Sequence, residues 1–193
     1  MDLPYAFADS ISKMVPQEIN ITLKDALANS LNYVSAYLMK QFGPQALVNM
    51  AHNMGVKTWL DPVPSLCVGS ADVPVYEMVS AFNTFPSKGV YVEPLAVLRI
   101  EDKNGNVLAT FTPKKREAIS EKAAFLMVNL MEGVVNSGTA YRIRALYVPQ
   151  GAVAGKTGTT MAAGNCLALA VTDEEIHKLR ESDPRPKSVQ KLK

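Results

Sequence analysis

The chain has 193 residues, of which 48% are hydrophobic and 20% charged, enough for one domain with its own core. Its formal net charge is +2, but residues 178–193 alone carry +4, which leaves −2 on residues 1–177. This near-neutral body argues against a nucleic-acid partner. No apolar run approaches the roughly 20 residues that cross a bilayer, and the first residues do not resemble a secretory signal. We therefore expect membrane contact only through an anchor that this chain lacks.

The N-terminal third predicts three helices after residues 1–21, which show no clear period. Thr22 can cap the first helix with its hydroxyl,. A break is expected at residues 29–32, because Asn and Ser side chains compete for backbone hydrogen bonds. The second helix ends at Gly43-Pro44, where proline can occupy the first turn of the third helix. Gly55 is the expected C-terminal cap of that third helix.

The middle of the chain predicts a loop, a helix and a hairpin. Residues 56–72 are loop-like, and Pro74 opens a helix that runs to about residue 82. Two strand-like runs, 95–101 and 107–112, flank Asn104-Gly105. Asn-Gly between β-rich runs is a strong hairpin signal because both residues tolerate a positive φ.

The last third predicts a long helix and a further strand. Ser120 can cap an apolar helix over residues 121–135, and strand character returns at residues 152–155. The tail from about residue 181 is predicted to be disordered. Helices followed by a hairpin, a long helix and another strand indicate an α+β fold.

One candidate functional motif is Lys156-Thr157-Gly158-Thr159, which directly follows the last predicted strand. Lys156 can supply positive charge, Thr157 and Thr159 hydroxyl donors for an anionic group, and Gly158 room for a ligand backbone. An extended peptide could then pair along the strand edge. The alternative is a glycine-rich turn with a solvated lysine, and the spacing of a phosphate loop is absent.

A second candidate motif is Ser30-Leu31-Asn32, at the predicted break between two helices. The serine hydroxyl and the asparagine amide can both face a cleft if the segment leaves the helical period. Taken alone, the pattern favours ordinary helix capping over a functional site.

Ser-x-Asn on an inter-helix turn, followed about 125 residues later by Lys-Thr-Gly-Thr on a strand, resembles the penicillin-binding proteins and serine β-lactamases. The segments between the motifs resemble the transpeptidase domain of a Bacteroidetes-like class A (bifunctional) penicillin-binding protein. They are Ala28–Asn32, Gly43-Pro44, Gly69–Asp72, Tyr76–Met78, Phe85–Gly89, Glu93-Pro94, Ile100–Asp102, Asn104-Gly105, Gly133–Val135 and Gly138-Thr139.

The resemblance implies a penicillin-binding protein fold, with helices packed on an antiparallel sheet, and a D,D-transpeptidase that cross-links peptidoglycan through an acyl-serine. Its partners would be the D-Ala-D-Ala stem peptide and β-lactams, it would need no cofactor, and the full-length family acts at the periplasmic face of the inner membrane. By resemblance, Ser30 relays a proton to the leaving amine, Asn32 orients the substrate amide, and Lys156 sets the electrostatic field. Thr157 and Thr159 would hold the substrate carboxylate beside Gly158, with the Thr159 amide in the oxyanion hole.

The chain departs from the family pattern at the nucleophile. Ser10-Ile11-Ser12-Lys13 fits the Ser-x-x-Lys letters but precedes Ser30 by only 20 residues, too few for the helices that normally intervene. Ser188–Lys191 also fits, in the charged tail. We expect neither serine to be the nucleophile, so that the chain alone would be inactive. His52 and His177 are isolated, which argues against a metal site.

The chain also departs after the second motif, where the family's Asp-x-Trp strand is not found. Residues 161–171 are predicted to form an apolar strand instead, so the hairpin beside the Lys-Thr-Gly strand is expected to be missing or replaced. The resulting division is an uncertain segment at 1–21, a partial transpeptidase domain at 22–160 and a divergent end at 161–193, as in a gene fragment. A noncatalytic module that recognises peptidoglycan peptides or β-lactams is the alternative, and a fragment that folds only with further segments is a third.

Overall fold

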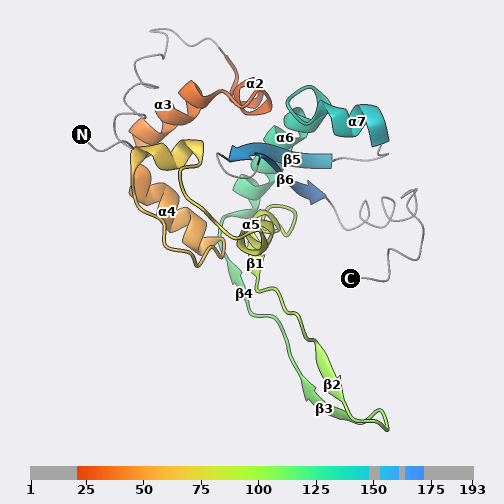
Figure 1. Cartoon of the computed structure of the whole chain (residues 1–193). Helices are drawn as coiled ribbons and strands as arrows, with labels where there is room; N and C mark the ends of the chain where they lie inside the picture. The colour runs from red at the N-terminus through yellow and green to blue at the C-terminus, as the bar shows by residue number, and fades with distance from the viewer. Residues whose placement is uncertain (1–20, 148–152, 161–163, 172–193) are drawn as a thin grey trace.

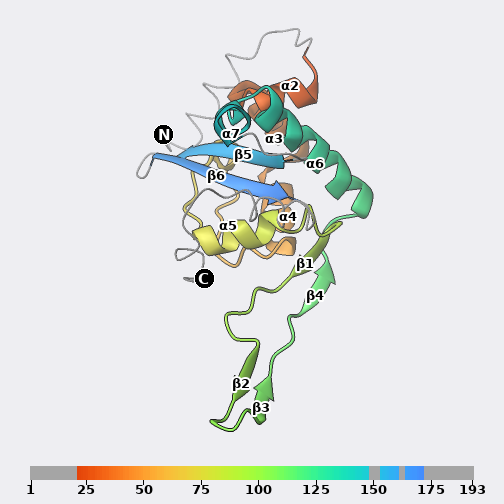
Figure 2. The same ribbon diagram turned by 90° about the vertical axis from the view of Figure 1, so that its right-hand side faces the viewer.

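A computed structural model describes residues 21–147, 153–160 and 164–171 (Figure 1). A helical body encloses one β-hairpin, and a long β arm projects from it (Figures 1 and 2). The helices are α2 (Leu23–Ala28), α3 (Asn32–Phe42), α4 (Pro44–Asn53), α5 (Val75–Phe82), α6 (Glu121–Asn136) and α7 (Tyr141–Tyr147), with the 3₁₀ helix η1 at Pro64–Val68. The strands are β1 (Val90–Val92), β2 (Arg99–Glu101), β3 (Val107–Thr110), β4 (Lys115–Glu117), β5 (Val153–Thr160) and β6 (Gly164–Val171). The α+β class predicted from the sequence is confirmed.

The predicted helix boundaries are confirmed where a cap sets them. Thr22 caps α2 through a hydrogen bond from the Asp25 amide, and Ser120 caps α6 through one from the Ala123 amide,. Pro44 occupies the first turn of α4, and Gly55, just beyond its end, has φ +99°,. Strands β1 and β4, helix η1 and helix α7 were not predicted.

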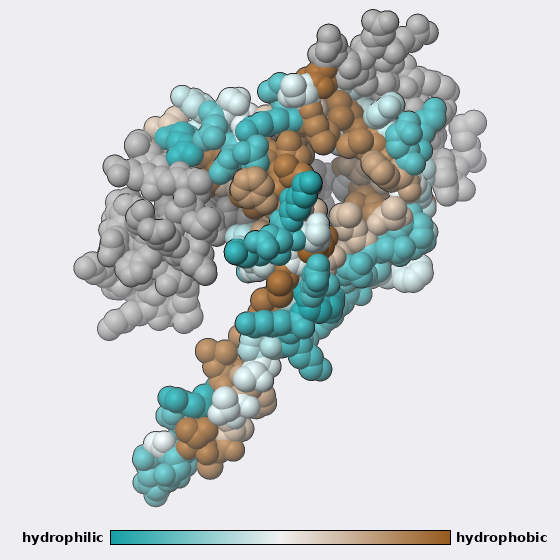
Figure 3. Space-filling model, turned by 180° about the vertical axis from the view of Figure 1, so that it is seen from behind, coloured by the Kyte–Doolittle hydropathy of each residue, from teal (hydrophilic) through white to brown (hydrophobic). Residues whose placement is uncertain are grey.

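The arm is a two-stranded ribbon, β2 with β3, that continues from the antiparallel pair of β1 and β4 (Figure 2). Its turn confirms the prediction at Asn104-Gly105: Gly105 has φ +85°, and the Asp102 carboxylate accepts hydrogen bonds from the Asn104 and Asn106 amides. A hydrogen bond from the Asn106 side chain, together with these amide bonds, lowers the pKa of Asp102. Hydrophobic patches follow the arm in Figure 3. The cross-strand pairs Leu98–Phe111 and Ile100–Ala109 place these four side chains on one face,.

The core centres on α6, which packs along β5, while α5 packs on β6 (Figure 2). Val134 and Val135 of α6 are fully buried with Val153 of β5, and Met131 is buried beside Ala154. Leu27 of α2 packs against both groups. Because Leu27 lies three residues before Ser30, the core directly anchors the turn that carries this serine. A separate core cluster joins α4 to α5 through Val48, Met54, Val56, Leu60 and Ala81.

The β5–β6 hairpin tests the prediction that the hairpin beside the Lys-Thr-Gly strand is missing or replaced. Strand β6 lies within the predicted apolar run 161–171 and pairs antiparallel with β5 along its whole length, from Val153 opposite Val171 to Thr160 opposite Gly164. The hairpin is therefore replaced by an apolar strand and is not missing. Pairing by β6 occupies one edge of β5.

Arg116 of β4 joins the end of α4 to the β1–β4 pair. Its guanidinium donates to the carbonyls of His52 and Asn53 at 3.0 Å and lies 4.5 Å from the Tyr91 ring centroid,. A Cβ on Gly55 would lie 2.0 Å from Tyr91, so only glycine fits this contact.

Replacing Thr84 by valine is expected to stabilise the fold. Thr84 is 0% exposed, and its hydroxyl has no hydrogen-bond partner among the residues that the structure describes. Valine keeps the shape and removes an unsatisfied polar group, which is worth about 1 kcal/mol. Urea unfolding measures the change. Thr84→Ser, which keeps the hydroxyl and loses the methyl, should destabilise instead; a valine variant less stable than wild type would show that the hydroxyl has a partner.

Candidate active site

The turn between α2 and α3 carries Ser30 out of the helical path. Ser30 has φ +55°, in the left-handed region, and its amide donates to the Leu27 carbonyl at 3.1 Å. The Leu31 amide donates to the Ala26 carbonyl at 3.0 Å, and the Asn29 side chain donates to the Asp25 carbonyl at 2.9 Å. These local bonds end α2 and leave the Ser30 side chain exposed,. The predicted break at residues 29–32 is thus confirmed.

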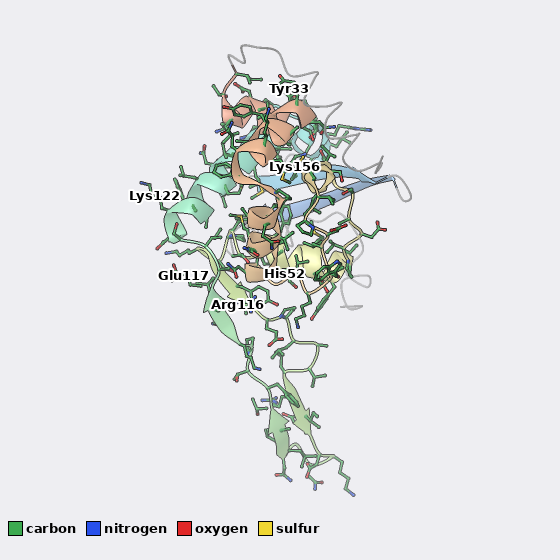
Figure 4. The ribbon with its side chains drawn as sticks, turned by 90° about the vertical axis from the view of Figure 1, so that its left-hand side faces the viewer. Tyr33, His52, Arg116, Glu117, Lys122 and Lys156 are labelled. Carbon is green, nitrogen blue, oxygen red and sulfur yellow. The ribbon has the colours of Figure 1, made fainter. Side chains whose placement is uncertain are left out.

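Lys156 of β5 reaches this turn from a position 126 residues away in the sequence. Its ammonium donates to Ser30 Oγ at 2.8 Å and to the Thr157 carbonyl at 2.6 Å. The side chain is half-buried and lies below Tyr33 of α3 in Figure 4. The fold therefore brings together the two motifs that the sequence singled out.

Burial of Lys156 lowers the pKa of its ammonium,. When the ammonium donates to Ser30 Oγ, the serine keeps its own proton for another acceptor. A serine that accepts on one side and donates on the other can relay a proton. The lowered pKa of Lys156 makes its ammonium easier to deprotonate, so that it can replace the proton that Ser30 gives away,.

We expect the stability of the chain to rise with pH relative to Lys156→Met. In the window between the lowered pKa of folded Lys156 and its ordinary value of 10.5, the unfolded chain binds more protons than the folded one, so unfolding becomes less favourable as pH increases. Below the lowered pKa both states are protonated, and the cost of burying the charge is constant. Urea unfolding of both proteins from pH 7 to 10 measures the difference. A difference that is flat, or that falls with pH, would contradict the assignment.

Thr139, in the turn between α6 and α7, connects the Ser30 turn to β5. Its amide donates to the Ala28 carbonyl at 3.0 Å, and its hydroxyl lies 2.6 Å from the Thr157 hydroxyl. A Cβ on the preceding Gly138 would lie 2.2 Å from the Ala28 carbonyl oxygen. Sequence reasoning used Gly138-Thr139 only for the resemblance and missed its place in the site. The spacing of the motifs gives no signal for it, because the contact depends on how α6 packs between α2 and β5.

The other predicted site residues have fewer contacts. Asn32 begins α3, is exposed, and makes no side-chain hydrogen bond within the described part of the chain. Gly158 is exposed on β5 opposite Cys166, and the Thr159 backbone pairs with Asn165. The Thr159 side chain, Ser10 and Ser188 lie outside what the structure describes.

Over the described ranges, no group of three His, Cys, Asp or Glu side chains is placed to hold a metal ion. His52 is half-buried, and its Nδ1 lies 2.7 Å from the Val56 carbonyl oxygen. His177 lies outside the described residues. Over the same ranges, no helix has the length and apolar character needed to span a membrane.

Comparison with known proteins gives the chain a family. The family model for the penicillin binding protein transpeptidase domain matches residues 5–172. Penicillin-binding protein 1A of Aquifex aeolicus is 32% identical over 141 residues, 73% of this chain and 19% of that protein. Penicillin-binding protein 1B of Escherichia coli is 35% identical over 142 residues, 72% of this chain and 17% of that protein. The chain thus spans less than a fifth of these relatives.

Solved structures agree on the fold. Penicillin-binding protein 1A of Haemophilus influenzae superposes with a TM-score of 0.68 at 18% identity, covering 90% of this chain and 37% of that one. Penicillin-binding protein A of Mycobacterium tuberculosis gives a TM-score of 0.61 at 18% identity, covering 88% and 50%. The Bacteroidetes affinity stays a prediction. With the Ser-x-Asn turn hydrogen-bonded to the Lys-Thr-Gly strand, the chain belongs to the penicillin-binding protein transpeptidase family and is part of the transpeptidase domain of a class A member.

Proposed function

We propose that this chain supplies the carboxylate-binding and proton-relay side of a D,D-transpeptidase site that acts on peptidoglycan stem peptides ending in D-Ala-D-Ala. The observation that carries the proposal is the 2.8 Å hydrogen bond from Lys156 Nζ to Ser30 Oγ. Acyl transfer to an amine needs a donor for the leaving nitrogen, and Ser30 keeps its proton for that purpose while it accepts from Lys156. Peptidoglycan lies outside the cytoplasmic membrane, so we place the reaction there.

The substrate would lie along β5, beyond the Ser30–Lys156 pair. Lys156 provides positive charge at the start of the motif, and the Thr157 and Thr159 hydroxyls would donate to the terminal carboxylate. The exposed Gly158 has no side chain to keep a peptide backbone away from the strand,. Asn32 would orient the substrate amide, since its side chain is exposed and makes no hydrogen bond within the described part of the chain.

β-Lactams are the natural probes of this proposal. One similar solved structure, penicillin-binding protein A of Mycobacterium tuberculosis, is an acyl-enzyme complex with penicillin G. The carboxylate of a penicillin would occupy the place of the D-Ala carboxylate, beside Thr157 and Thr159. A covalent adduct further requires a nucleophilic serine, which we expect neither Ser10 nor Ser188 to supply.

The test is incubation of the full chain with a fluorescent penicillin, read by intact mass and by equilibrium dialysis. Saturable binding without a mass increase is the expected result and supports a carboxylate-binding site on this chain, which the proposed function and a noncatalytic recognition module both require. A mass increase that Ser10→Ala abolishes would support the transpeptidase and overturn our exclusion of Ser10. Absence of both binding and adduct, in a chain that unfolds cooperatively, would contradict the proposed function.

A further inference from the structure

Thr139 contacts both halves of the site. Its backbone amide binds the carbonyl of Ala28, two residues before Ser30, at 3.0 Å. Its side-chain hydroxyl lies 2.6 Å from the Thr157 hydroxyl, on the residue directly after Lys156. One residue therefore holds the end of α2 through its main chain and the β5 edge through its side chain.

The direction of the hydroxyl pair is open in the free protein, since either threonine can donate to the other. An anion at Thr157 removes this freedom. Each hydroxyl has one proton, so a Thr157 that donates to a carboxylate must accept from Thr139. Two consecutive hydrogen bonds then run from Thr139 to Thr157 and from Thr157 to the carboxylate. Because they point in the same direction, each polarises the other.

We propose that Thr139 is a positioning residue for carboxylate recognition: it orients the Thr157 proton toward the ligand and stabilises the donating direction of that hydroxyl. The proposal rests on the proposed function, in which Thr157 binds the substrate carboxylate. Thr139 itself touches no substrate in this scheme. It acts through Thr157, and its effect should depend on the negative charge of the ligand.

The experiment compares benzylpenicillin with its methyl ester, which lacks the negative charge, as ligands of the full chain. Thr139→Val removes the hydroxyl but keeps the shape and the amide that binds Ala28. We expect it to weaken benzylpenicillin binding about tenfold and to leave ester binding unchanged. Thr139→Ser should restore the preference for the carboxylate form. Thr110→Val, an exposed threonine on the arm, is the matched control and should change neither affinity.

The results separate this inference from the proposed function. If the wild type prefers the carboxylate form and Thr139→Val keeps the whole preference, the positioning role is wrong and the proposed function stands. If Thr139→Val weakens both ligands equally, the residue has only a structural role and the inference is again overturned. If the wild type binds neither ligand, the proposed function fails.

A double-mutant cycle decides the hydroxyl contact without any ligand. Thr139→Val, Thr157→Val and the double variant are compared by thermal unfolding. A shift in Tm for the double variant that is clearly smaller than the two single shifts together shows that the hydroxyls stabilise each other. Additive shifts would overturn the positioning role even if the chain binds penicillin.

Discussion

Gly138→Ala is expected to destabilise the chain by about 2–3 kcal/mol and to separate the two motifs of the site. The added Cβ would lie 2.2 Å from the Ala28 carbonyl oxygen and 2.7 Å from its carbon, both of them backbone atoms. Such a contact requires α2 to move away from the turn that follows α6. Because Ser30 follows Ala28 by two residues, the 2.8 Å bond from Lys156 should break with it. Urea unfolding and penicillin binding measure the two effects.

Gly133→Ala, five residues earlier and inside α6, is the matched control. Its Cβ would lie 3.1 Å from Lys24 Cγ, a flexible side chain that can move, and alanine is favoured over glycine inside a helix by about 1 kcal/mol. This variant should be as stable as the wild type or more so. If Gly138→Ala were equally harmless, the close approach of the α6–α7 turn to α2 would not be required for the site.

Lys156→Met is expected to weaken penicillin binding by about ten- to a hundredfold, under the proposed function. Methionine is unbranched like lysine, but it cannot donate a hydrogen bond to Ser30 Oγ and carries no charge to attract a carboxylate. Hydrogen bonds that involve a charged group contribute about 1.5–3 kcal/mol, which corresponds to this range of affinity. Equilibrium dialysis with a fluorescent penicillin measures the loss.

Lys103→Met, at the exposed tip of the arm, controls for the change in net charge and should bind as the wild type does. The methionine at position 156 should not unfold the chain, because it removes a charge that burial disfavours,. Full penicillin affinity in a folded Lys156→Met variant would exclude Lys156 from ligand recognition.

Local sequence signals predicted the elements whose ends depend on a cap or a turn. The caps at Thr22 and Ser120 and the turn at Asn104-Gly105 depend only on residues within a few positions. Such local interactions can be predicted from the sequence without knowledge of the fold. The two site motifs were found for a different reason. Their order along the chain resembled a family, and only the packing of α2 on α6 and β5 brings Ser30 to Lys156.

Long-range contacts account for what the sequence could not predict. Strands β1 and β4 have three residues each and exist because residues 90–92 pair with residues 115–117. The whole arm separates these two segments in the sequence. Thr139 shows the same limit within the site, since its partners Ala28 and Thr157 lie in distant segments. Neither hydrophobic period nor turn chemistry encodes such pairings.

The left-handed backbone at Ser30 sets a conflict between folding and chemistry at one position. A residue with a Cβ at φ +55° costs about 1–2 kcal/mol relative to glycine,. Selection for stability alone would favour glycine or asparagine there, as at many helix ends. Glycine would lose the hydroxyl that Lys156 binds, and asparagine would replace it with a bulkier amide. Under the proposed function, Ser30 lowers the stability of the turn in exchange for its hydroxyl group. The core contacts of Leu27 hold the turn in the conformation that the reaction needs.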